Sequence, residues 1–272
     1  MKLATWNLSG IFALALGLGL LLISSGVRAE ETDPNEIVRK ARENNLLDGS
    51  EGLSTMTIAN KKGQKRVRKM VMVSKLFDKG KTEKKFIRFI EPADIKGTAL
   101  LTYDYDKKDD DIWLYLPRNR KTRRIVASDK AKNFMGSEFT YADMTPADLD
   151  DFNYTLLPAE SVDGVDCYVV QAVPKDEDVE DENGFSKRVS YIGKKDYVTR
   201  KSVYFDLDGE TWKTLSASNI EEIDKDKHRF RPKLLVMTNQ QNGRVSTIKV
   251  EKLQLRKEIP DEYFTTRYLE RE

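Results

Sequence analysis

Most of the chain after residue 48 alternates between apolar and polar residues with a period of two. Runs such as QKRVRKMVMVSKLF, SKRVSYIG, VTRKSVYFD and STIKVEKLQL follow one another, and turns rich in glycine, aspartate and lysine separate them. A period of two is typical of β-strands, in which successive side chains point to opposite faces. Roughly a dozen such runs at short, regular spacing predict one long antiparallel meander, curled into a sheet or barrel.

Several of the predicted strands are apolar on both faces. In residues 111–116, Ile112 and Leu114 alternate with Trp113 and Tyr115. The same pattern recurs in RKMVMVSKLF, KKFIRFI and TALLTY. A strand with one face in water would carry polar residues at every second position. The second apolar face therefore needs either another layer of the protein or a bound guest, and the pattern is compatible with both.

Three segments depart from the period of two. The stretch TDPNEIVRKARENN predicts a helix, with Asp33 as N-cap, Pro34 at the first helical position and Glu36 as the capping-box partner. Residues 127–151 are too long for a hairpin and rich in Phe, Met and Tyr, and residues 259–272 form a short amphipathic stretch. We expect both of these last segments to cover an open apolar surface.

The first 29 residues have the layout of a secretory signal peptide. A basic residue, Lys2, precedes an apolar run that ends at Ile23, and a small-residue cleavage site ends at Ala29. The run has about 16 residues, fewer than the roughly 20 that a membrane-spanning helix needs. We expect cleavage near Ala29, export to the periplasm and a single domain over residues 30–272. An uncleaved membrane anchor is the alternative.

The charge of the chain is balanced in number but uneven in position. Removal of the leader takes Lys2 and Arg28 from the 47 basic residues and leaves 45 against 45 acidic ones. Residues 61–88 hold 12 Lys or Arg, whereas residues 138–182 hold 14 Asp or Glu. We expect no nucleic acid as a partner of a neutral exported protein. An anionic membrane surface or an acidic protein patch fits the basic half better.

The residues that catalysis or metal binding usually needs are scarce. Cys167 is the only cysteine and His228 the only histidine, so there is no His–Cys metal set and no histidine-based triad. We expect Cys167 to be buried and inert, and His228 to be exposed. The aspartates from Asp104 to Asp111 are interpreted as a charged turn, and the acidic residues 175–184 as a solvated loop. We expect no cofactor, no metal and no enzymatic activity; a hydrolase with a carboxylate pair is the least favoured alternative.

Three stretches between residues 86 and 144 carry a resemblance to a known family: RFIEPADIKGTALLTYD, DIWLYLPRNRKTRRI and SDKAKNFMGSEFTYADM. They resemble the outer-membrane lipoprotein-sorting proteins of the LolA-like superfamily, in particular the branch found beside resistance-nodulation-division (RND) type exporters. The resemblance implies a mainly β fold with few helices: an incomplete, half-open antiparallel β-barrel with helices covering its concave face. It also implies a carrier that shields the acyl chains of a lipid or lipoprotein in an apolar cavity, and passes them between an inner-membrane RND-type exporter and the outer membrane.

With this resemblance, the second apolar face is predicted to line an apolar hollow. The cavity residues are then Met70, Met72, Phe89, Leu101, Trp113 and Tyr115. A movable flap over the cavity is formed by Phe134, Met135, Phe139 and Tyr141. A basic rim that meets an anionic membrane surface or an acidic partner consists of Arg118, Arg120, Lys121, Arg123 and Arg124. The alternative function is a non-catalytic regulatory or scaffolding module of the same fold that senses lipidated ligands.

Overall fold

The structure, a computed structural model, describes residues 31–146 and 148–271 of the chain. These described residues group into one unit. The predicted leader, residues 1–29, lies outside the described residues, so its cleavage stays a prediction. None of the described helices is long and apolar enough to cross a membrane.

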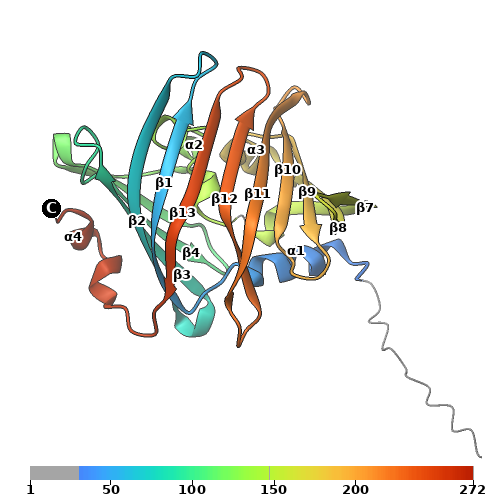
Figure 1. The fold of residues 1–272 in the computed structure, drawn as a ribbon, viewed down its shortest axis with the longest axis horizontal. Helices are drawn as coiled ribbons and strands as arrows, with labels where there is room; N and C mark the ends of the chain where they lie inside the picture. Colours follow the sequence, from blue (N-terminus) through green and yellow to red (C-terminus); the bar gives the residue numbers. More distant parts are fainter. Residues whose placement is uncertain (1–30, 147, 272) are drawn as a thin grey trace, which may run out of the picture. The chain divides into compact units, whose positions relative to one another are not determined.

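Within the described residues, thirteen strands form a single antiparallel sheet in the spatial order β6-β5-β4-β3-β2-β1-β13-β12-β11-β10-β9-β8-β7 (Figure 1). In chain order they are β1 (Gly49–Ala59), β2 (Lys65–Phe77), β3 (Thr82–Glu91), β4 (Ala99–Tyr105), β5 (Asp111–Leu116), β6 (Lys121–Arg124), β7 (Phe152–Val162), β8 (Val165–Pro174), β9 (Lys187–Gly193), β10 (Thr199–Phe205), β11 (Thr211–Asp224), β12 (Arg229–Asn239) and β13 (Val245–Leu255). The α-helices of the described residues are α1 (Pro34–Asn44), α2 (Ala127–Lys130), α3 (Glu177–Asn183) and α4 (Thr266–Leu269).

The sheet is curled but not closed. Pairing of β1 with β13 joins two meanders, β1–β6 and β7–β13, whose outer edges β6 and β7 do not pair with each other. In Figure 1 the middle strands face the viewer, and α2 and α3 lie behind them on the concave face. The predicted mainly β, half-open antiparallel fold with helices on its concave face is confirmed.

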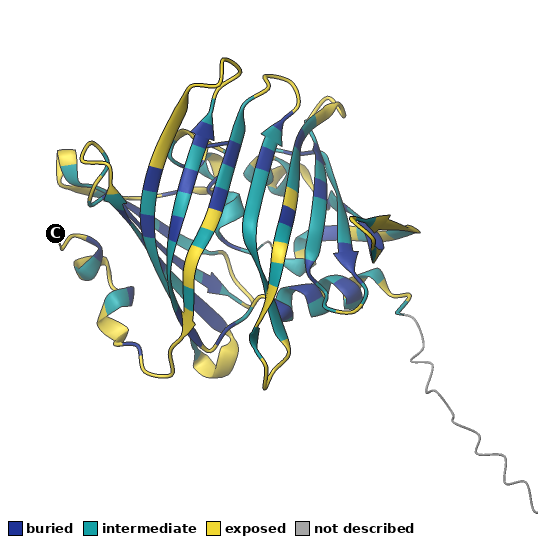
Figure 2. Ribbon diagram, viewed as in Figure 1, coloured by how far each residue is buried: buried dark blue, intermediate teal, exposed yellow. Residues whose placement is uncertain are grey.

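Burial along the strands shows which faces are covered (Figure 2). On β1 burial alternates, and Ser54, Met56 and Ile58 are buried while their neighbours are partly exposed. On β4 the first four residues are all buried, so that both faces are covered there. The apolar pattern on both faces of the predicted strands thus corresponds to two protein layers, one on each side of β3–β5.

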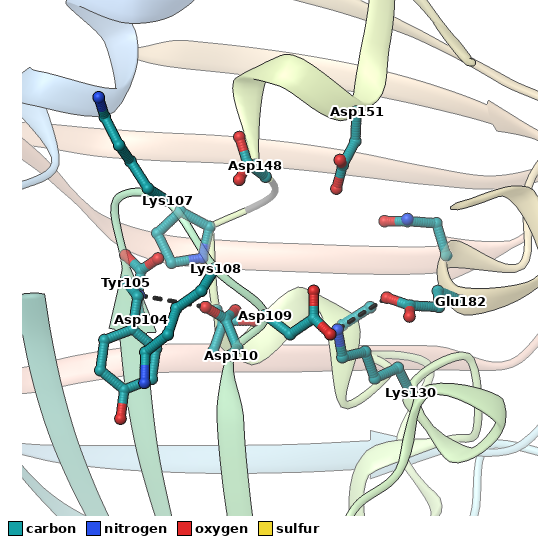
Figure 3. Close-up of a pocket in the computed structure, with 14 residues that line it drawn as sticks. Asp104, Tyr105, Lys107, Lys108, Asp109, Asp110, Lys130, Asp148, Asp151 and Glu182 are labelled. Carbon is teal, nitrogen blue, oxygen red and sulfur yellow. Dashed lines mark hydrogen bonds and ion pairs between the residues drawn. The ribbon is translucent and has the colours of Figure 1, made fainter. Parts of the chain in front are cut away.

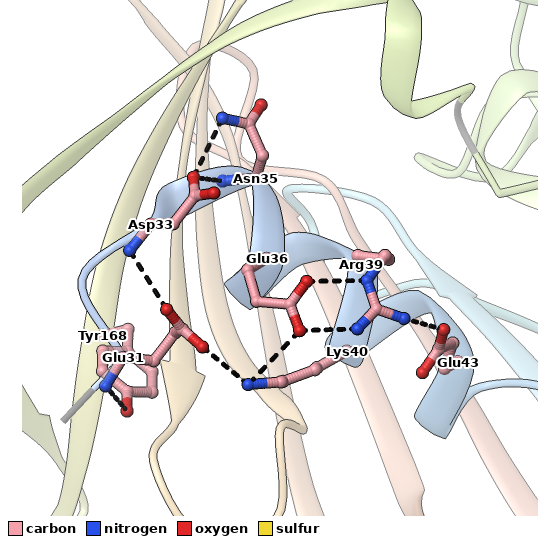
Figure 4. A network of polar contacts seen from close by, with 8 residues as sticks. All are labelled: Glu31, Asp33, Asn35, Glu36, Arg39, Lys40, Glu43 and Tyr168. Carbon is pink, nitrogen blue, oxygen red and sulfur yellow. Dashed lines mark hydrogen bonds and ion pairs between the residues drawn. The ribbon is translucent and has the colours of Figure 1, made fainter. Parts of the chain in front are cut away.

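Helix α1 begins where the sequence predicts. The carboxylate of Asp33 caps it by accepting a hydrogen bond from the N–H of Asn35 at 2.9 Å. Glu36 is not the capping-box partner, because its carboxylate pairs with Arg39 at 2.5 Å and with Lys40 at 3.4 Å instead (Figure 4). The helix packs on β8 and β9 through a buried apolar cluster of Ile37, Ala41, Tyr168, Val170 and Ile192.

The acidic residues 175–184, predicted to form a loop, contain helix α3. Asp176 caps this helix by accepting a hydrogen bond from the N–H of Val179 at 3.0 Å. Gly184 ends it in the left-handed conformation, at φ 70°. Acidic side chains in the first turn are favourable beside the positive end of a helix dipole. The prediction of a loop is wrong, because the two caps and the helix dipole stabilise a helix here despite the high density of acidic residues.

The C-terminal residues 259–269 form a strap over the convex face of β3–β5. The buried side chains of this convex cluster are Phe86, Ala99, Leu101, Tyr115, Ile259, Phe264 and Leu269. Arg88 fixes the end of the strap, because its Nη2 donates hydrogen bonds to the carbonyl oxygens of Tyr268 at 2.8 Å and Leu269 at 3.2 Å. The strap covers apolar surface, as predicted.

Candidate functional site

The concave face of the sheet is a continuous apolar surface. Its buried side chains come from both meanders and include Met56, Met70, Phe89, Leu114, Tyr204 and Met237. Residues 127–146 and 148–151, which lie between β6 and β7 in the sequence, cover this face, and we call them the covering segment. Among the described residues of this segment, the regular structure is α2, three short 3-10 turns and an isolated β-bridge between Asn133 and Thr140. Where the covering segment lies on the concave face, the covering layer is therefore largely irregular backbone.

Aromatic side chains of the covering segment fill the middle of the concave face. Phe134 is completely buried, and its ring centroid lies 5.8 Å from that of Phe89. Tyr141 packs edge-on against Phe134 with the centroids 5.6 Å apart. Phe139 is buried and Met135 is partly buried in the same cluster. The four residues predicted as a flap thus lie on the apolar face, and their movement stays a prediction.

The six residues predicted to line one cavity lie on opposite faces of the sheet. Directly paired residues of an antiparallel sheet share a face. Met70 pairs with Phe89 on the concave face, and Met72 packs against the same cluster. The convex face holds the other three, Leu101, Trp113 and Tyr115. The prediction that these three residues line the same cavity as Met70, Met72 and Phe89 is therefore wrong. It could not be made correctly from the sequence, because strands that are apolar on both faces give no sign of which face is concave.

The covering segment packs into the concave face. Two pockets found among the described residues are lined mainly by charged and polar side chains. Side chains of the segment lie against the surface that was expected to line an open apolar cavity, so that cavity stays a prediction. An acyl chain can reach the concave surface only if the covering segment moves.

Two arginines hold the tip of the covering segment. Met135 and Gly136 are both in the left-handed region, at φ 51° and 75°. A left-handed non-glycine residue costs about 1–2 kcal/mol, so the surrounding structure must hold this turn. Arg68 donates a hydrogen bond to the carbonyl oxygen of Met135, and Arg244 Nη2 donates one to that of Gly136 at 2.6 Å.

Glu138 anchors the covering segment from a buried position, with its side chain 3% exposed. Its Oε1 lies 2.9 Å from Arg244 Nε, and its Oε2 accepts a hydrogen bond from Asn239 Nδ2 at 2.8 Å. The N–H of Glu138 donates to Ser246 Oγ at 2.8 Å. A buried carboxylate is costly unless it is paired, so these partners specify where the segment docks.

A second buried ion pair lies on the neighbouring strand. Lys213 of β11 has a side chain only 1% exposed, and its Nζ lies 3.0 Å from Oδ2 of Asp143 in the covering segment. The same oxygen accepts hydrogen bonds from the N–H and Oγ1 of Thr140 at 2.8 and 3.0 Å. Lys213 Nζ also lies 4.7 Å from the ring centroid of Tyr204 and 4.5 Å from that of Trp212.

Sequence analysis did not identify these polar anchors. One sign was available: Lys213 shares a face of its predicted strand with Leu215 and Ala217, and a lysine on an apolar face is unusual. Glu138 and Asp143 lie in irregular backbone, where no period shows whether a side chain points inward.

A polar pocket of about 200 Å³ lies between the β4–β5 turn and the covering segment (Figure 3). Asp104, predicted as part of a charged turn, lies in β4 and is 5% exposed, and its Oδ1 lies 2.9 Å from Arg42 Nη2. Burial raises the pKa of Asp104 to about 7, although Arg42 acts in the opposite direction. Burial also raises the pKa of Asp110 and of Asp151. Within the described ranges, no group of three or more His, Cys, Asp or Glu side chains is arranged to hold a metal ion.

The predicted basic rim is the β5–β6 hairpin, and all five of its basic residues are exposed. Two of them are paired locally, Arg123 with Asp129 at 3.1 Å and Arg124 with Asp111. The other three make no ion pair in the part of the chain that the structure describes: Arg118, Arg120 and Lys121. These three are therefore available to an outside partner.

The single cysteine and the single histidine lie away from the concave site. Cys167 is buried on β8, and burial raises the pKa of its thiol, as expected of an inert side chain. His228 lies in the β11–β12 turn with its side chain 81% exposed, also as predicted.

Three solved structures are similar to this chain over most of its length. A DUF1329 family protein from Desulfovibrio piger is 29% identical, with a TM-score of 0.80 over 88% of this chain and 100% of that chain. A protein domain described as outer membrane lipoprotein-sorting, from Vibrio parahaemolyticus, is 27% identical, with a TM-score of 0.79 over 88% of this chain and 98% of that chain. A LolA superfamily protein from Nitrosomonas europaea is 22% identical and shares the fold, with a TM-score of 0.67 over 88% of this chain and 100% of that chain.

The sequence comparisons add a family. No curated protein matches the chain. A family model with the description "Uncharacterized protein" matches residues 81–271, which is more than half of the sequence. The matched region runs from the start of β3 to the end of the strap and includes the covering segment. The chain therefore belongs to the family of that model, and its fold is that of the outer-membrane lipoprotein-sorting proteins of the LolA superfamily.

Proposed function

We propose that the protein is a periplasmic carrier that shields the acyl chains of a lipid or lipoprotein on its concave face. The observation that carries this proposal is the covering segment, a largely irregular, polar-anchored layer over a continuous apolar surface. A permanent second layer over a sheet is usually made of regular helices or strands. We infer that the covering segment moves aside and that an acyl chain takes its place.

The free energy gained by binding an acyl chain is close to the free energy lost by displacing the covering segment. Each buried methylene contributes about 0.8 kcal/mol, so a long acyl chain gains on the order of 10 kcal/mol. Displacement exposes Phe134, Phe139 and Tyr141, at about 2 kcal/mol each. It also breaks several anchoring hydrogen bonds, each worth about 1 kcal/mol. A carrier needs such a balance, because it must release its cargo as well as hold it.

The basic rim supports contact with a donor or acceptor surface. A lysine or arginine near an anionic membrane contributes about 1 kcal/mol to binding. The three unpaired side chains of the rim suit a transient contact, either with anionic head groups or with an acidic patch of an inner-membrane RND-type exporter. Delivery to the outer membrane would complete the transfer.

A disulfide that locks the covering segment tests the proposal. The N–H of Glu138 donates to Ser246 Oγ at 2.8 Å, so the paired variant Glu138→Cys with Ser246→Cys puts one thiol on the covering segment and one on the adjacent part of β13. We expect the oxidised variant to lose binding of an anthroyloxy-labelled palmitate, because the segment is tethered to β13. Reduction should restore binding.

The two single variants are the controls, since they change the same side chains without a tether. Native mass spectrometry of the protein purified from cells should also reveal a co-purified lipid. Binding of the labelled palmitate by the oxidised pair as tightly as by the single variants would overturn the proposal.

A further inference from the structure

Strand register places four polar side chains in one row across the concave face. Arg188 of β9 pairs with Tyr204 of β10, Tyr204 pairs with Lys213 of β11, and Lys213 pairs with Asn239 of β12. Paired neighbours share a face, and Tyr204 belongs to the concave apolar cluster. The row is thus a polar strip within an otherwise apolar surface.

The covering segment supplies the acids that face this row. Asp143 Oδ2 lies 3.0 Å from Lys213 Nζ, and Glu138 Oε2 accepts a hydrogen bond from Asn239. The Arg188 guanidinium lies 5.9 Å from the ring centroid of Tyr204. Its Nε is buried and has no hydrogen-bond partner among the described residues. The strip therefore holds two cations, one paired with a carboxylate that leaves when the segment moves.

Once the covering segment has moved away, this strip should favour acidic ligands over neutral ones. Lys213 is 1% exposed, and an ammonium group left unpaired on an apolar surface is strongly unfavourable. A ligand with its own acidic group restores the pairing that Asp143 provided. A neutral ligand of the same length does not restore this pairing. Its complex with the protein therefore includes the free-energy cost of an unpaired, buried lysine.

We propose that the cargo is an anionic amphiphile, whose acidic head group takes the position of the Asp143 carboxylate, paired with Lys213 and beside Arg188. Its hydrocarbon chain lies along the apolar cluster toward Phe89 and Met70. This inference rests on the proposed function, because the position is vacated only when the covering segment moves. The shared chemistry is a compact acid, either a carboxylate or a phosphate.

Three ligands with the same sixteen-carbon chain test the inference: palmitate, hexadecyl phosphate and hexadecanol. We expect at least one acid to bind the full chain about tenfold or more tightly than the alcohol, because a buried charge pair is kept. The tighter of the two acids identifies the head group. In Lys213→Met the ratio of acid to alcohol affinity should fall to about one. In Asp143→Asn all three ligands should bind more tightly, with the ratio preserved.

Two further variants test whether a preference for the acid has a cause other than the charge of Lys213. Lys213→Arg keeps the charge and should keep the preference for the acid. Lys252→Met removes an exposed lysine of β13 and should leave the ratio unchanged, which excludes general attraction to a basic protein. Equal affinity of the wild-type chain for all three ligands would overturn this inference and leave the carrier function standing. Binding of none of them would overturn both.

Discussion

Arg244 Nε lies 2.9 Å from Oε1 of Glu138, and this contact joins the β12–β13 turn to the covering segment. The arginine belongs to a turn between two strands of the sheet, whereas the glutamate belongs to the segment that must move if the concave face is to open. Asn239 holds the other carboxylate oxygen at 2.8 Å. The pair is therefore the contact that we expect to control opening.

The variant Glu138→Gln should open the protein more readily. Glutamine keeps the shape of the side chain and can still accept from Asn239, but the charge that binds Arg244 is lost. Loss of the charge from this buried side of the ion pair weakens the docking of the covering segment, so affinity for a labelled palmitate should rise about tenfold or more. Amide hydrogen exchange in residues 134–141 should accelerate in parallel.

The matched control is Lys249→Met, which breaks the exposed pair of Lys249 with Glu251 at 2.8 Å on the convex face of β13. We expect neither affinity nor exchange to change in this variant. Unchanged exchange of residues 134–141 in Glu138→Gln would show that the pair does not hold the segment.

Two tryptophans should report on opposite faces of the sheet. Trp212 packs against the concave cluster and its ring lies 4.5 Å from Lys213 Nζ, whereas Trp113 packs on the convex face, 5.0 Å from the ring of Tyr103. Two variants each keep one tryptophan: both have Trp6 replaced by Phe, and each also has either Trp113 or Trp212 replaced by Phe. The variant that keeps Trp212 should change its fluorescence emission on addition of palmitate. The variant that keeps Trp113 should not. A response from Trp113 alone would place the ligand on the convex face.

The strap should stabilise the fold without forming part of the ligand site. Phe264 is 1% exposed and packs edge-on against Phe77, with the ring centroids 5.5 Å apart. Phe264→Ala should lower the free energy of unfolding by about 3–5 kcal/mol, measured by urea denaturation. Leu255→Ala, at a leucine that is 41% exposed, is the control and should change it little. Loss of palmitate affinity in folded Phe264→Ala would contradict the assignment of the site to the concave face.

Local signals predicted the elements of this fold well. The period of two located the strands, and Asp33 with Pro34 located the start of α1. Helix α3 has standard end signals in Asp176 and Gly184, but its high density of acidic residues is equally typical of a solvated loop. The irregular segments were predicted to cover apolar surface from their aromatic content alone.

The faces and the anchors could not be predicted, because they depend on pairing between distant strands. Leu101 and Met70 look equivalent in sequence, yet register places them on opposite sides of the sheet. The partners of the two anchoring acids lie 70 residues away for Asp143 and 101 residues away for Glu138. No local period contains that information.

The free cations of the rim should control membrane contact. Charge reversal of Arg118, Arg120 and Lys121 to Glu should weaken binding to phosphatidylglycerol vesicles, by about 1 kcal/mol for each lost cation. The midpoint of thermal unfolding should hardly change, since these side chains are exposed. Vesicle binding that survives the triple reversal would remove the rim from the transfer step.

Stability should depend on pH through Asp104, which is buried beside Arg42. Burial raises its pKa from 3.8 to about 7, so between about pH 4 and pH 7 the folded chain binds a proton that the unfolded chain has released. The contribution of this group to stability is therefore full below pH 4, falls as the pH rises to 7, and is constant above that. The decline for one such proton is at most about 1.4 kcal/mol per pH unit.

The variant Asp104→Asn should remove this part of the slope. The free energy of unfolding in urea, measured at pH 5, 6, 7 and 8, should decline less steeply than in the wild-type chain. Burial raises the pKa values of Asp110 and Asp151 as well, so part of the decline in stability with pH should remain in this variant. Asp106→Asn changes an exposed aspartate of the same turn and should keep the wild-type slope. Equal slopes in Asp104→Asn and Asp106→Asn would mean that Asp104 is already ionised when the protein folds at pH 5. In that case Arg42, and not burial, would govern its charge.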